Sequence, residues 1–512
     1  MVFRSLNRIF ARYMKKGLRR YGNMVLSVLV GIGIFLFWYV FYPHALSYQE
    51  QYQLFLWTGD YFLERMSVPG GLADWLGEFI VQFYYVEWLG ALLLALLFVV
   101  LQRLTARLLP KKWWLLSVLP VILLWWLMGD INVLLSFPVA VVLALFAAWI
   151  MGKLVKPDKL VILVMIELLM VPLLYWLIGP AVWIYILVRV CQLGWKHLWL
   201  AGWFVAVQLI AYAWLLPQWP LQQVLSGLNY YRIPLHYPQL KGYDKEMYEL
   251  IRQDYLVRNE RWDEIVKRAQ QYQVKTPFSS VCVNLALSKK RQLADRMFDF
   301  YQSGDDALIM PRIRDLTSML PSAEAFWHLG MVNSAQRYMF DTQESILNGR
   351  KSGRCTKRIA ECMMVNGHQK TAAKQLALLK KTLFYRSWAK EAEALMKDKE
   401  KMDKHPVYGR LRQLRYKENF LYSYEEMDKM FGLLFMNNNE NKMALDYFLA
   451  QMLLKGNLQG FQQYLGLARQ YGGYREMPLG YQDVMRCIQA QGRVPDSPFA
   501  KYVQRMMERR GE

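Results

Sequence analysis

Residues that usually carry metal or redox chemistry are scarce in this chain of 512 residues, which contains six histidines and five cysteines. No Cys-x-x-Cys pair occurs, and no histidine lies at metal-ligand spacing, so the sequence predicts no metal site and no cofactor. The five cysteines are interpreted as small, buried apolar residues. They are Cys191, Cys282, Cys355, Cys362 and Cys487.

The common catalytic motifs are also missing. The sequence has no Walker A loop, no Gly-x-Ser-x-Gly, no His-Glu-x-x-His and no Asp-x-Asp, so phosphate-cradling and zinc-hydrolase activities have no support. No segment shows the sustained alternation of a β-strand. These absences favour an all-α protein and a non-enzymatic role, while leaving an enzyme open.

Acidic residues are few in the first part of the chain, with 9 Asp and Glu against 17 Lys and Arg before Pro220. That part is apolar throughout, whereas the remainder is interpreted as a soluble helical domain. A net charge of +22 can indicate a nucleic-acid partner, but the positive-inside rule explains much of the N-terminal excess. Because no nucleic-acid module is visible, the basic surface is assigned to anionic lipid headgroups or an acidic partner.

The N-terminus carries a basic amphipathic segment over residues 1–22. Arg4, Arg8 and Arg12 share one helical face, and we expect this segment to lie on the inner membrane surface. The apolar block that follows has about 20 residues, enough to span a bilayer. No Ala-x-Ala cleavage site follows it, so we interpret it as a retained anchor.

Hydrophobic blocks within residues 23–219 predict about seven membrane spans. They are Gly22 to Tyr42, Trp88 to Leu101, Trp113 to Met128, Val133 to Met151, Leu160 to Ile178, Ala181 to Leu193 and Leu198 to Leu216. The sixth block is short and leaves two alternatives. A full span puts the C-terminal domain in the periplasm of a bacterial cell, and a re-entrant piece puts it in the cytoplasm. A full span gathers the basic loops on one side, which favours a cytoplasmic N-terminus and a periplasmic C-terminal domain in the inner membrane.

The outer loop, residues 43–87, reverses the charge balance, with one base, Arg65, and six acids. The acids are Glu50, Asp60, Glu64, Asp74, Glu78 and Glu87. Apolar residues at helical spacing on either side of Pro69-Gly70-Gly71 predict two short interfacial helices. Its acidity places this loop on the outer side of the membrane.

A first span, an acid-bearing outer loop and many later spans form a layout that resembles the start of GT-C-type glycosyltransferases. The resemblance implies a loop carboxylate as catalytic base and a polyprenyl-linked sugar as donor. By position, the base would be Glu50 or Asp60, with Glu64 as a further candidate. This protein departs from those enzymes in its seven spans and in lacking a second acid pair. The alternative is that these acids are solvated charges on interfacial helices.

Two ionisable residues lie within the apolar blocks. Glu167 is in the middle of the fifth block, and Arg189, in the sixth, is the nearest basic candidate. A charge inside a bilayer is costly and marks a candidate functional position. The two residues are either a link between helices or part of an ion or substrate path, and the second alternative makes a transporter a third hypothesis.

Prolines interleaved with aromatic residues make residues 220–242 a linker, and helix pairs around short polar turns fill residues 243–512. One pair is Lys245 to Arg258 with Arg261 to Tyr272, and another is Ser279 to Ser288 with Arg291 to Tyr301. The start positions of the second helices resemble a tetratricopeptide-type array. Such an array offers a concave surface for a peptide or protein, and an ordinary packed helical domain is the alternative.

Three segments carry a resemblance that extends over the full length of the protein. They are Tyr48 to Phe55 (YQEQYQLF), Pro69-Gly70-Gly71, and Phe79 to Tyr84. With them the sequence resembles an uncharacterised family of Bacteroidetes-type polytopic membrane proteins, which implies no activity and no site residues. The leading hypothesis is an inner-membrane scaffold whose periplasmic helical-repeat domain binds a protein partner in envelope assembly. The alternative is a GT-C-like transferase acting on a polyprenyl-linked glycan.

Overall fold

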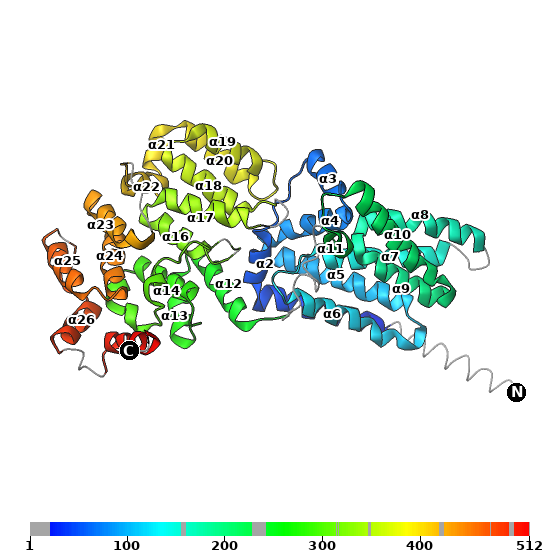
Figure 1. Ribbon diagram of the computed structural model, residues 1–512, viewed down its shortest axis with the longest axis horizontal. Coiled ribbons are helices and arrows are strands. Elements are labelled where there is room, and N and C mark those ends of the chain that lie inside the picture. The colour runs from blue at the N-terminus through cyan, green and yellow to red at the C-terminus, as the bar shows by residue number, and fades with distance from the viewer. Residues whose placement is uncertain are drawn as a thin grey trace. The chain divides into compact units, whose positions relative to one another are not determined.

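The computed structural model describes residues 21–154, 160–227, 242–313, 315, 317–346, 350–418, 424–471, 473–490 and 496–510. Every regular element in this part of the protein is a helix, so the all-α prediction is confirmed. The protein divides into two compact units, Met1–Asp244 and Lys245–Glu512, which we call the membrane unit and the helical unit (Figure 1). Residues 1–20 of the expected basic segment and residues 228–241 of the expected linker lie outside the described residues.

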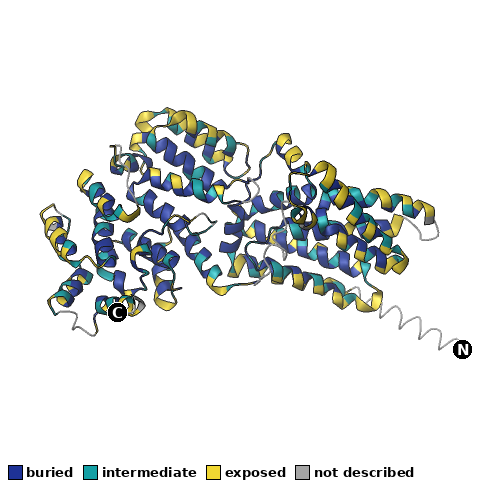
Figure 2. Ribbon diagram, viewed as in Figure 1, coloured by how far each residue is buried: buried dark blue, intermediate teal, exposed yellow. Residues whose placement is uncertain are grey.

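Six stretches of the membrane unit are long and apolar enough to cross a bilayer, so the prediction of a membrane protein is confirmed. They are Tyr21–Phe41, Glu87–Leu108 (α5), Lys111–Met128 (ending in α6, Leu119–Met128), Ser136–Leu154 (α7), Val161–Leu193, and Trp195–Leu215 (containing α10, Trp199–Ile210). Apolar side chains such as Val28, Leu29 and Ile32 are exposed on their surface. Figure 2 shows exposed residues along these helices and buried residues between them, as expected for helices that face lipid.

The longest of these stretches folds back on itself. It consists of α8 (Leu160–Ile178) and α9 (Val182–Leu193), separated by a 3-10 turn over Gly179–Ala181. A continuous helix would hold Glu167 about 33 Å from Arg189, yet Arg189 Nε lies 2.7 Å from Glu167 Oε1. The six stretches therefore contain seven helical segments, because two of the expected blocks are joined in one 33-residue stretch.

The far end of α9 reaches the end of α7. A Cβ at Gly152, near the C-terminus of α7, would lie 3.3 Å from Oε1 of Gln192 on α9. The 12 residues of α9 measure only about 18 Å along the axis. This short helix nevertheless extends to the same end of the bundle as Lys153 of α7.

The outer loop forms three short helices, α2 (Pro43–Glu50), α3 (Gly59–Met66) and α4 (Gly71–Val81), followed by a 3-10 turn over Gln82–Tyr85. The hydroxyl of Thr58 accepts a hydrogen bond from the Tyr61 N–H and begins α3, which exposes Phe62 and Leu63. α4 instead packs into the bundle, because a Cβ at Gly77 would lie only 2.7 Å from the backbone nitrogen of Ser136 on α7. Helix α3 thus presents an apolar face to its surroundings, whereas α4 packs into the bundle.

The helical unit consists of short helices that pack against their neighbours in sequence. They are α12 (Lys245–Arg258), α13 (Trp262–Gln271), α14 (Pro277–Lys289), α15 (Leu293–Arg296), α16 (Leu320–Leu329), α17 (Val332–Glu344), α18 (Gly353–Asn366), α19 (Gln369–Leu379), α20 (Arg386–Lys397), α21 (Lys399–Lys404), α22 (Tyr408–Leu414), α23 (Met427–Asn437), α24 (Lys442–Leu454), α25 (Leu458–Gln470), α26 (Leu479–Gln489) and α27 (Pro498–Arg510). α16 packs on α17, α17 on α18, and α18 on α19. Each such pair buries apolar side chains that one short helix could not bury alone.

The helix expected from Arg291 to Tyr301 is much shorter in the structure, where α15 ends at Arg296 and a 3-10 turn ends at Asp299. Side chains take the backbone groups that a longer helix would pair. The Gln302 amide donates to the Met297 carbonyl at 2.6 Å, and Tyr301 N donates to the Gln273 side chain at 2.8 Å. These tertiary hydrogen bonds replace the last helical turn.

The C-terminal helices pack back onto the second helix pair of the helical unit. α26 contacts α15, and the ring of Phe499 on α27 lies 5.0 Å from that of Phe298. In an open solenoid each repeat touches only its neighbours in sequence. Here distant helices of the array meet, which ties the unit into a single body.

One turn geometry closes five helix pairs. Its central residues have φ between +53° and +85°, and in each turn the next N–H donates to the carbonyl five residues earlier. The central residues are Glu260, Arg291, Gly330, Gly367 and Gly456. This left-handed closure satisfies carbonyls at the helix end and favours glycine, yet two of the five positions carry long side chains.

Replacing Gly367 with alanine is expected to lower the free energy of unfolding of the helical unit by about 1 kcal/mol. No atom lies within 4 Å of the added Cβ, so the left-handed backbone alone opposes the change. Gly466, inside α25, is equally open, and there alanine should stabilise by about 0.5–1 kcal/mol. Hydrogen exchange of peptides from the full-length protein in detergent measures both. Equal protection in the two variants would contradict the prediction.

Four cysteines, Cys282, Cys355, Cys362 and Cys487, are buried and free, as expected. The interpretation is wrong for Cys191, which is exposed on α9. Its helix belongs to a membrane-spanning stretch, where an exposed apolar thiol faces lipid and needs no protein core to cover it.

Candidate functional site

The acids of the outer loop fall into two groups by exposure. Asp60 and Glu64 lie on α3 and are exposed, so they face the surroundings of the molecule. Glu50 at the end of α2 is 5% exposed, and Asp74 and Glu78 on α4 are no more than 1% exposed. The sequence proposes Glu50 or Asp60, with Glu64 as a further candidate, and the structure gives Glu50 a different environment from the other two.

A closed cluster around Arg65 holds two of the buried acids. Arg65 Nε lies 3.0 Å from Glu78 Oε2 and 3.8 Å from Asp74 Oδ2. The Tyr61 hydroxyl donates to Glu78, and the Ser136 hydroxyl donates to Asp74 at 3.1 Å. The cluster therefore joins α3, α4 and the start of α7 through charged hydrogen bonds.

The electrostatics of this cluster hold Tyr61 and Arg65 each in one protonation state. Burial and the negative charge of Glu78 raise the pKa of Tyr61 well above its ordinary value. Burial alone would lower the pKa of Arg65, but Glu78, Tyr61 and Asp74 outweigh it and raise that pKa. A phenol and a guanidinium that do not titrate near neutral pH are poor proton-transfer groups, so the cluster is a structural link.

Glu50 lies in a run of buried polar residues that connects the first span to α3. The run consists of His44, Gln49, Glu50, Gln51 and Gln53, each no more than 5% exposed. Nε2 of Gln49 and Oε1 of Gln53 have no hydrogen-bond partner among the described residues. Buried polar atoms are normally satisfied, so this environment suits water or a polar ligand. Only Glu50 of this run was a candidate from the sequence, because glutamines carry no charge pattern to single them out.

Glu167 and Arg189 form a buried pair between α8 and α9. Both side chains are no more than 1% exposed, and their closest atoms are 2.7 Å apart. The Tyr185 hydroxyl donates to the other carboxylate oxygen at 2.5 Å, and Arg189 Nη1 donates to Gln192 at 2.7 Å. The two residues that the sequence singled out inside the apolar blocks thus neutralise each other within one helical hairpin.

The helical unit contains a buried ion network that sequence reasoning missed. Arg354 on α18 binds both oxygens of Asp254 on α12, at 2.6 and 3.0 Å, and Glu324 on α16 at 3.2 Å. Arg358, also on α18, lies 2.7 Å from Glu324. Burial alone would raise the pKa of Glu324, but the two arginines outweigh it and lower it to about 2. The network joins α12, α16 and α18.

Metal binding finds no support in the described part of the protein, where no group of three or more His, Cys, Asp or Glu could hold an ion. His328 on α16 lies beside the ion network. Burial and the charge of Lys289 lower the pKa of His328 to about 3. The imidazole is therefore neutral near pH 7.

Replacing Asp446 with asparagine is expected to stabilise the helical unit increasingly as the pH rises from about 4 to about 7. Burial, with Asp295 nearby, raises the pKa of Asp446 to about 6, although the Tyr474 hydroxyl donates to it at 2.5 Å. Because the folded state holds this proton more tightly than the unfolded state does, ionising Asp446 destabilises the fold by about 2–3 kcal/mol. Asparagine keeps the acceptor for Tyr474 and removes the charge.

The test compares Asp446→Asn with the parent, by hydrogen exchange of α24 peptides at several pH values. His328 acts in the opposite direction, because its lowered pKa makes stability fall as the pH drops below about 6.5. This contribution is common to both proteins and cancels in their difference. A difference that does not change with pH would contradict the prediction.

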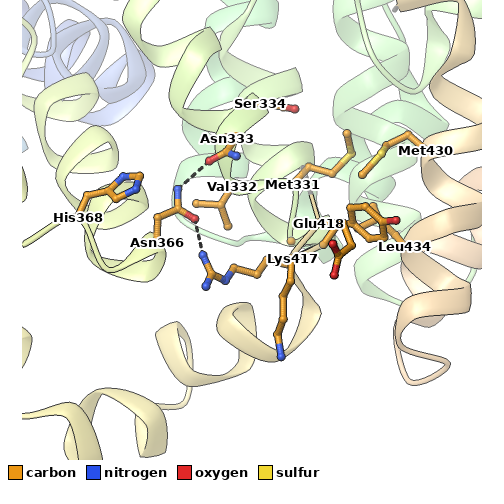
Figure 3. Close-up of a pocket in the computed structure, with 13 residues that line it drawn as sticks. Met331, Val332, Asn333, Ser334, Asn366, His368, Lys417, Glu418, Met430 and Leu434 are labelled. Atoms are coloured by element: carbon orange, nitrogen blue, oxygen red, sulfur yellow. Dashed lines mark hydrogen bonds between the residues drawn. The ribbon is translucent and has the colours of Figure 1, made fainter. Parts of the chain in front are cut away.

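An open cavity of about 310 Å³ lies on the helical unit. Its lining comes from the turn before α17 and the first residues of α17, from Asn366 at the end of α18 and His368 just before α19, from residues 415–418, and from α23. Asn366 donates to Asn333 at 2.7 Å and accepts from Arg415 Nη1 at 3.0 Å. The dashed lines in Figure 3 mark these two hydrogen bonds at the cavity wall.

A family described as being of unknown function (DUF6057) matches residues 19–511 of the sequence. This match confirms the expected resemblance to an uncharacterised protein family over nearly the whole length of the sequence. No curated protein and no solved structure matches the sequence.

Proposed function

Since the protein belongs to the family of unknown function DUF6057, we propose a role from its own geometry, that of a membrane anchor presenting its helical unit to a protein partner. The observation that carries this proposal is the array of paired helices, closed by one repeated turn and bearing an open polar cavity. Helix-pair arrays offer extended surfaces for peptides and proteins. The membrane unit supports the anchoring role, because its described intramembrane charges are paired with each other.

We further propose that the N-terminus lies in the cytoplasm and the helical unit in the periplasm, at the inner membrane of a bacterial cell, where the partner would act in envelope assembly. The acids of the outer loop and the bases near Lys153 support the assignment of these two segments to opposite sides of the membrane. The reach of α9 to Gly152 supports a full crossing by the sixth block. A C-terminal tag should be digested by protease in spheroplasts, and protection of the tag would overturn this topology.

Partner binding is tested by site-specific photo-crosslinking in living cells with the full-length protein. A photo-reactive residue at the exposed position of Ile313, Leu383 or Tyr464 in the helical unit should give a discrete protein adduct. The same residue at Leu169, exposed on α8, is the control and should give none. The absence of an adduct from every position in the helical unit, with the protein present in the membrane, would overturn the scaffold role.

The second candidate function is a GT-C-like transferase acting on a polyprenyl-linked sugar, and the burial of Glu50 favours it. Among the acids of residues 43–87, Glu50 is the buried one that stands outside the Arg65 cluster. A buried carboxylate beside glutamine side chains can accept a proton from a sugar hydroxyl. Asp60 and Glu64, both exposed on α3, lack this environment.

The transferase hypothesis predicts that Glu50→Gln abolishes a surface glycan while the protein remains in the membrane. Asp60→Asn and Glu64→Gln are the matched controls, since they remove exposed carboxylates from the same loop and should leave the glycan intact. An unchanged glycan in Glu50→Gln would exclude this hypothesis.

A further inference from the structure

We infer that the cavity beside Asn333, Asn366 and Arg415 binds a carboxylate of the protein partner. This inference rests on the proposed scaffold role and assigns its binding site and the chemistry that is recognised. Three segments that are distant in sequence build the cavity wall, namely residues 330–334, residues 366–368 and residues 415–418.

The hydrogen bonds at the wall leave donor groups that have no partner among the described residues. Arginine can only donate, so the Asn366 oxygen must face Arg415 and its amide nitrogen must face Asn333. The Asn333 oxygen is then used as an acceptor, and its NH2 group remains available. These two hydrogen bonds use the side-chain oxygens of Asn333 and Asn366 as acceptors. The NH2 group of Asn333 and Nη2 of Arg415 remain as donors.

Arg415 forms no ion pair within 4 Å with a described carboxylate, although Glu418 belongs to the same cavity lining. Its Nε is buried without a hydrogen-bond partner in the described part of the protein. Two other arginines of the helical unit do have carboxylate partners: Arg412 binds Asp403 at 2.6 Å and Arg358 binds Glu324 at 2.7 Å. A guanidinium with free donors binds a carboxylate through two parallel hydrogen bonds.

The remaining lining fits a short piece of polypeptide. Met331, Val332 and Leu434 provide an apolar side next to the polar wall. Lys417 adds a positive charge and Glu418 a negative one, so with Arg415 the three charged side chains of the lining sum to +1. A few apolar contacts with a small number of placed polar groups are typical of ligand pockets of this size. The net charge of +22 favours association with an acidic partner. The carboxylate is that of an Asp or Glu side chain or of the partner's C-terminal residue.

The test is peptide titration of the full-length protein in nanodiscs of neutral lipid, followed by fluorescence anisotropy. Three labelled probes separate the sources: hexaglutamate with an amidated C-terminus, a neutral Ser-Leu hexapeptide with a free C-terminal carboxylate, and amidated hexaglutamine. One or both carboxylate-bearing probes should bind, and hexaglutamine should not. Binding by none of them, or equally by all three, would overturn the inference.

Two variants and one control locate the binding. Arg415→Gln should lower the affinity for the carboxylate-bearing probe about tenfold or more, because it removes a charge-assisted donor. Asn333→Asp, at an exposed position, keeps the acceptor for Asn366 and replaces the free NH2 by a negative charge, so it should weaken binding as well. Lys390→Gln makes the same charge change at an exposed position outside the cavity and should leave binding unchanged.

Unaltered binding by Arg415→Gln and Asn333→Asp would overturn the cavity as the site. In cells, a partner that crosslinks equally to Arg415→Gln and to the parent would leave the scaffold role standing and remove the cavity from it. A helical unit that captures no partner at any position would remove the scaffold role itself, so the two failures are distinguishable.

Discussion

Replacement of Arg354 by methionine is expected to lower the free energy of unfolding of the helical unit by about 3–5 kcal/mol, the cost of breaking a buried ion pair from one side. Asp254, about 5% exposed, would lose the guanidinium that binds both of its oxygens, while Glu324 would keep only Arg358. A carboxylate buried without its partner is far less stable than one in water. The full-length protein in detergent provides the measurement, through hydrogen exchange of peptides from α12, α16 and α18.

Two further variants test whether an unpaired buried carboxylate causes the loss of stability in Arg354→Met. Asp254→Asn combined with Arg354→Met should recover part of the loss, since it neutralises one stranded carboxylate. Lys404→Met removes the base of an exposed pair, whose members are 74% and 76% exposed, and should change stability by about 0.5 kcal/mol or less. Similar losses of unfolding free energy in Arg354→Met and Lys404→Met would show that the buried network contributes no more to stability than an exposed ion pair.

Arg189→Met is expected to destabilise the membrane unit by about 3–5 kcal/mol. Glu167, with 0% exposure, would remain as an unpaired carboxylate inside an apolar bundle, and Met could not donate to it or to Gln192. The expected result is less folded protein in the membrane and a lower unfolding temperature in detergent. Leu187→Met, at a residue 64% exposed on the same helix, is the matched control and should be close to neutral.

The double variant Glu167→Gln with Arg189→Met separates the two interpretations of this pair. If the pair only links α8 to α9, the double variant should regain most of the stability and behave like the parent in cells. A double variant that is stable in the membrane, but gives cells the same phenotype as loss of the whole protein, would instead favour an ion or substrate path and support the transporter hypothesis. Failure of the double variant to regain stability would contradict the ion-pair explanation.

Local patterns in the sequence predicted the helices well. α12 begins at Lys245 and ends at Arg258, the residues expected from apolar spacing and the polar turn that follows. The expected helix beyond Arg291 failed, because Gln273 and Gln302 take its backbone groups. The hydrogen bond with Gln273 comes from 28 residues away, so helix propensity and periodicity could not anticipate it.

The candidate site was less predictable than the helices. Position in the loop could not separate Glu50 from Asp60 and left Glu64 as a further candidate, whereas burial separates Glu50 from the other two. The partners of the buried acids come from distant positions, as Ser136 does for Asp74. A linear pattern shows that an acid is present and gives no information about which distant residue neutralises it.

By itself, the sequence determined that this is an all-helical protein with several membrane-spanning stretches, because apolar run length and the helical period are properties of neighbouring residues. The tertiary structure alone decided that Glu167 faces Arg189, that Arg354 joins three helices, and that Arg415 keeps free donors at a cavity. The physical reason is that burial and hydrogen-bond partners depend on segments tens of residues apart. Those segments meet only when the helices pack.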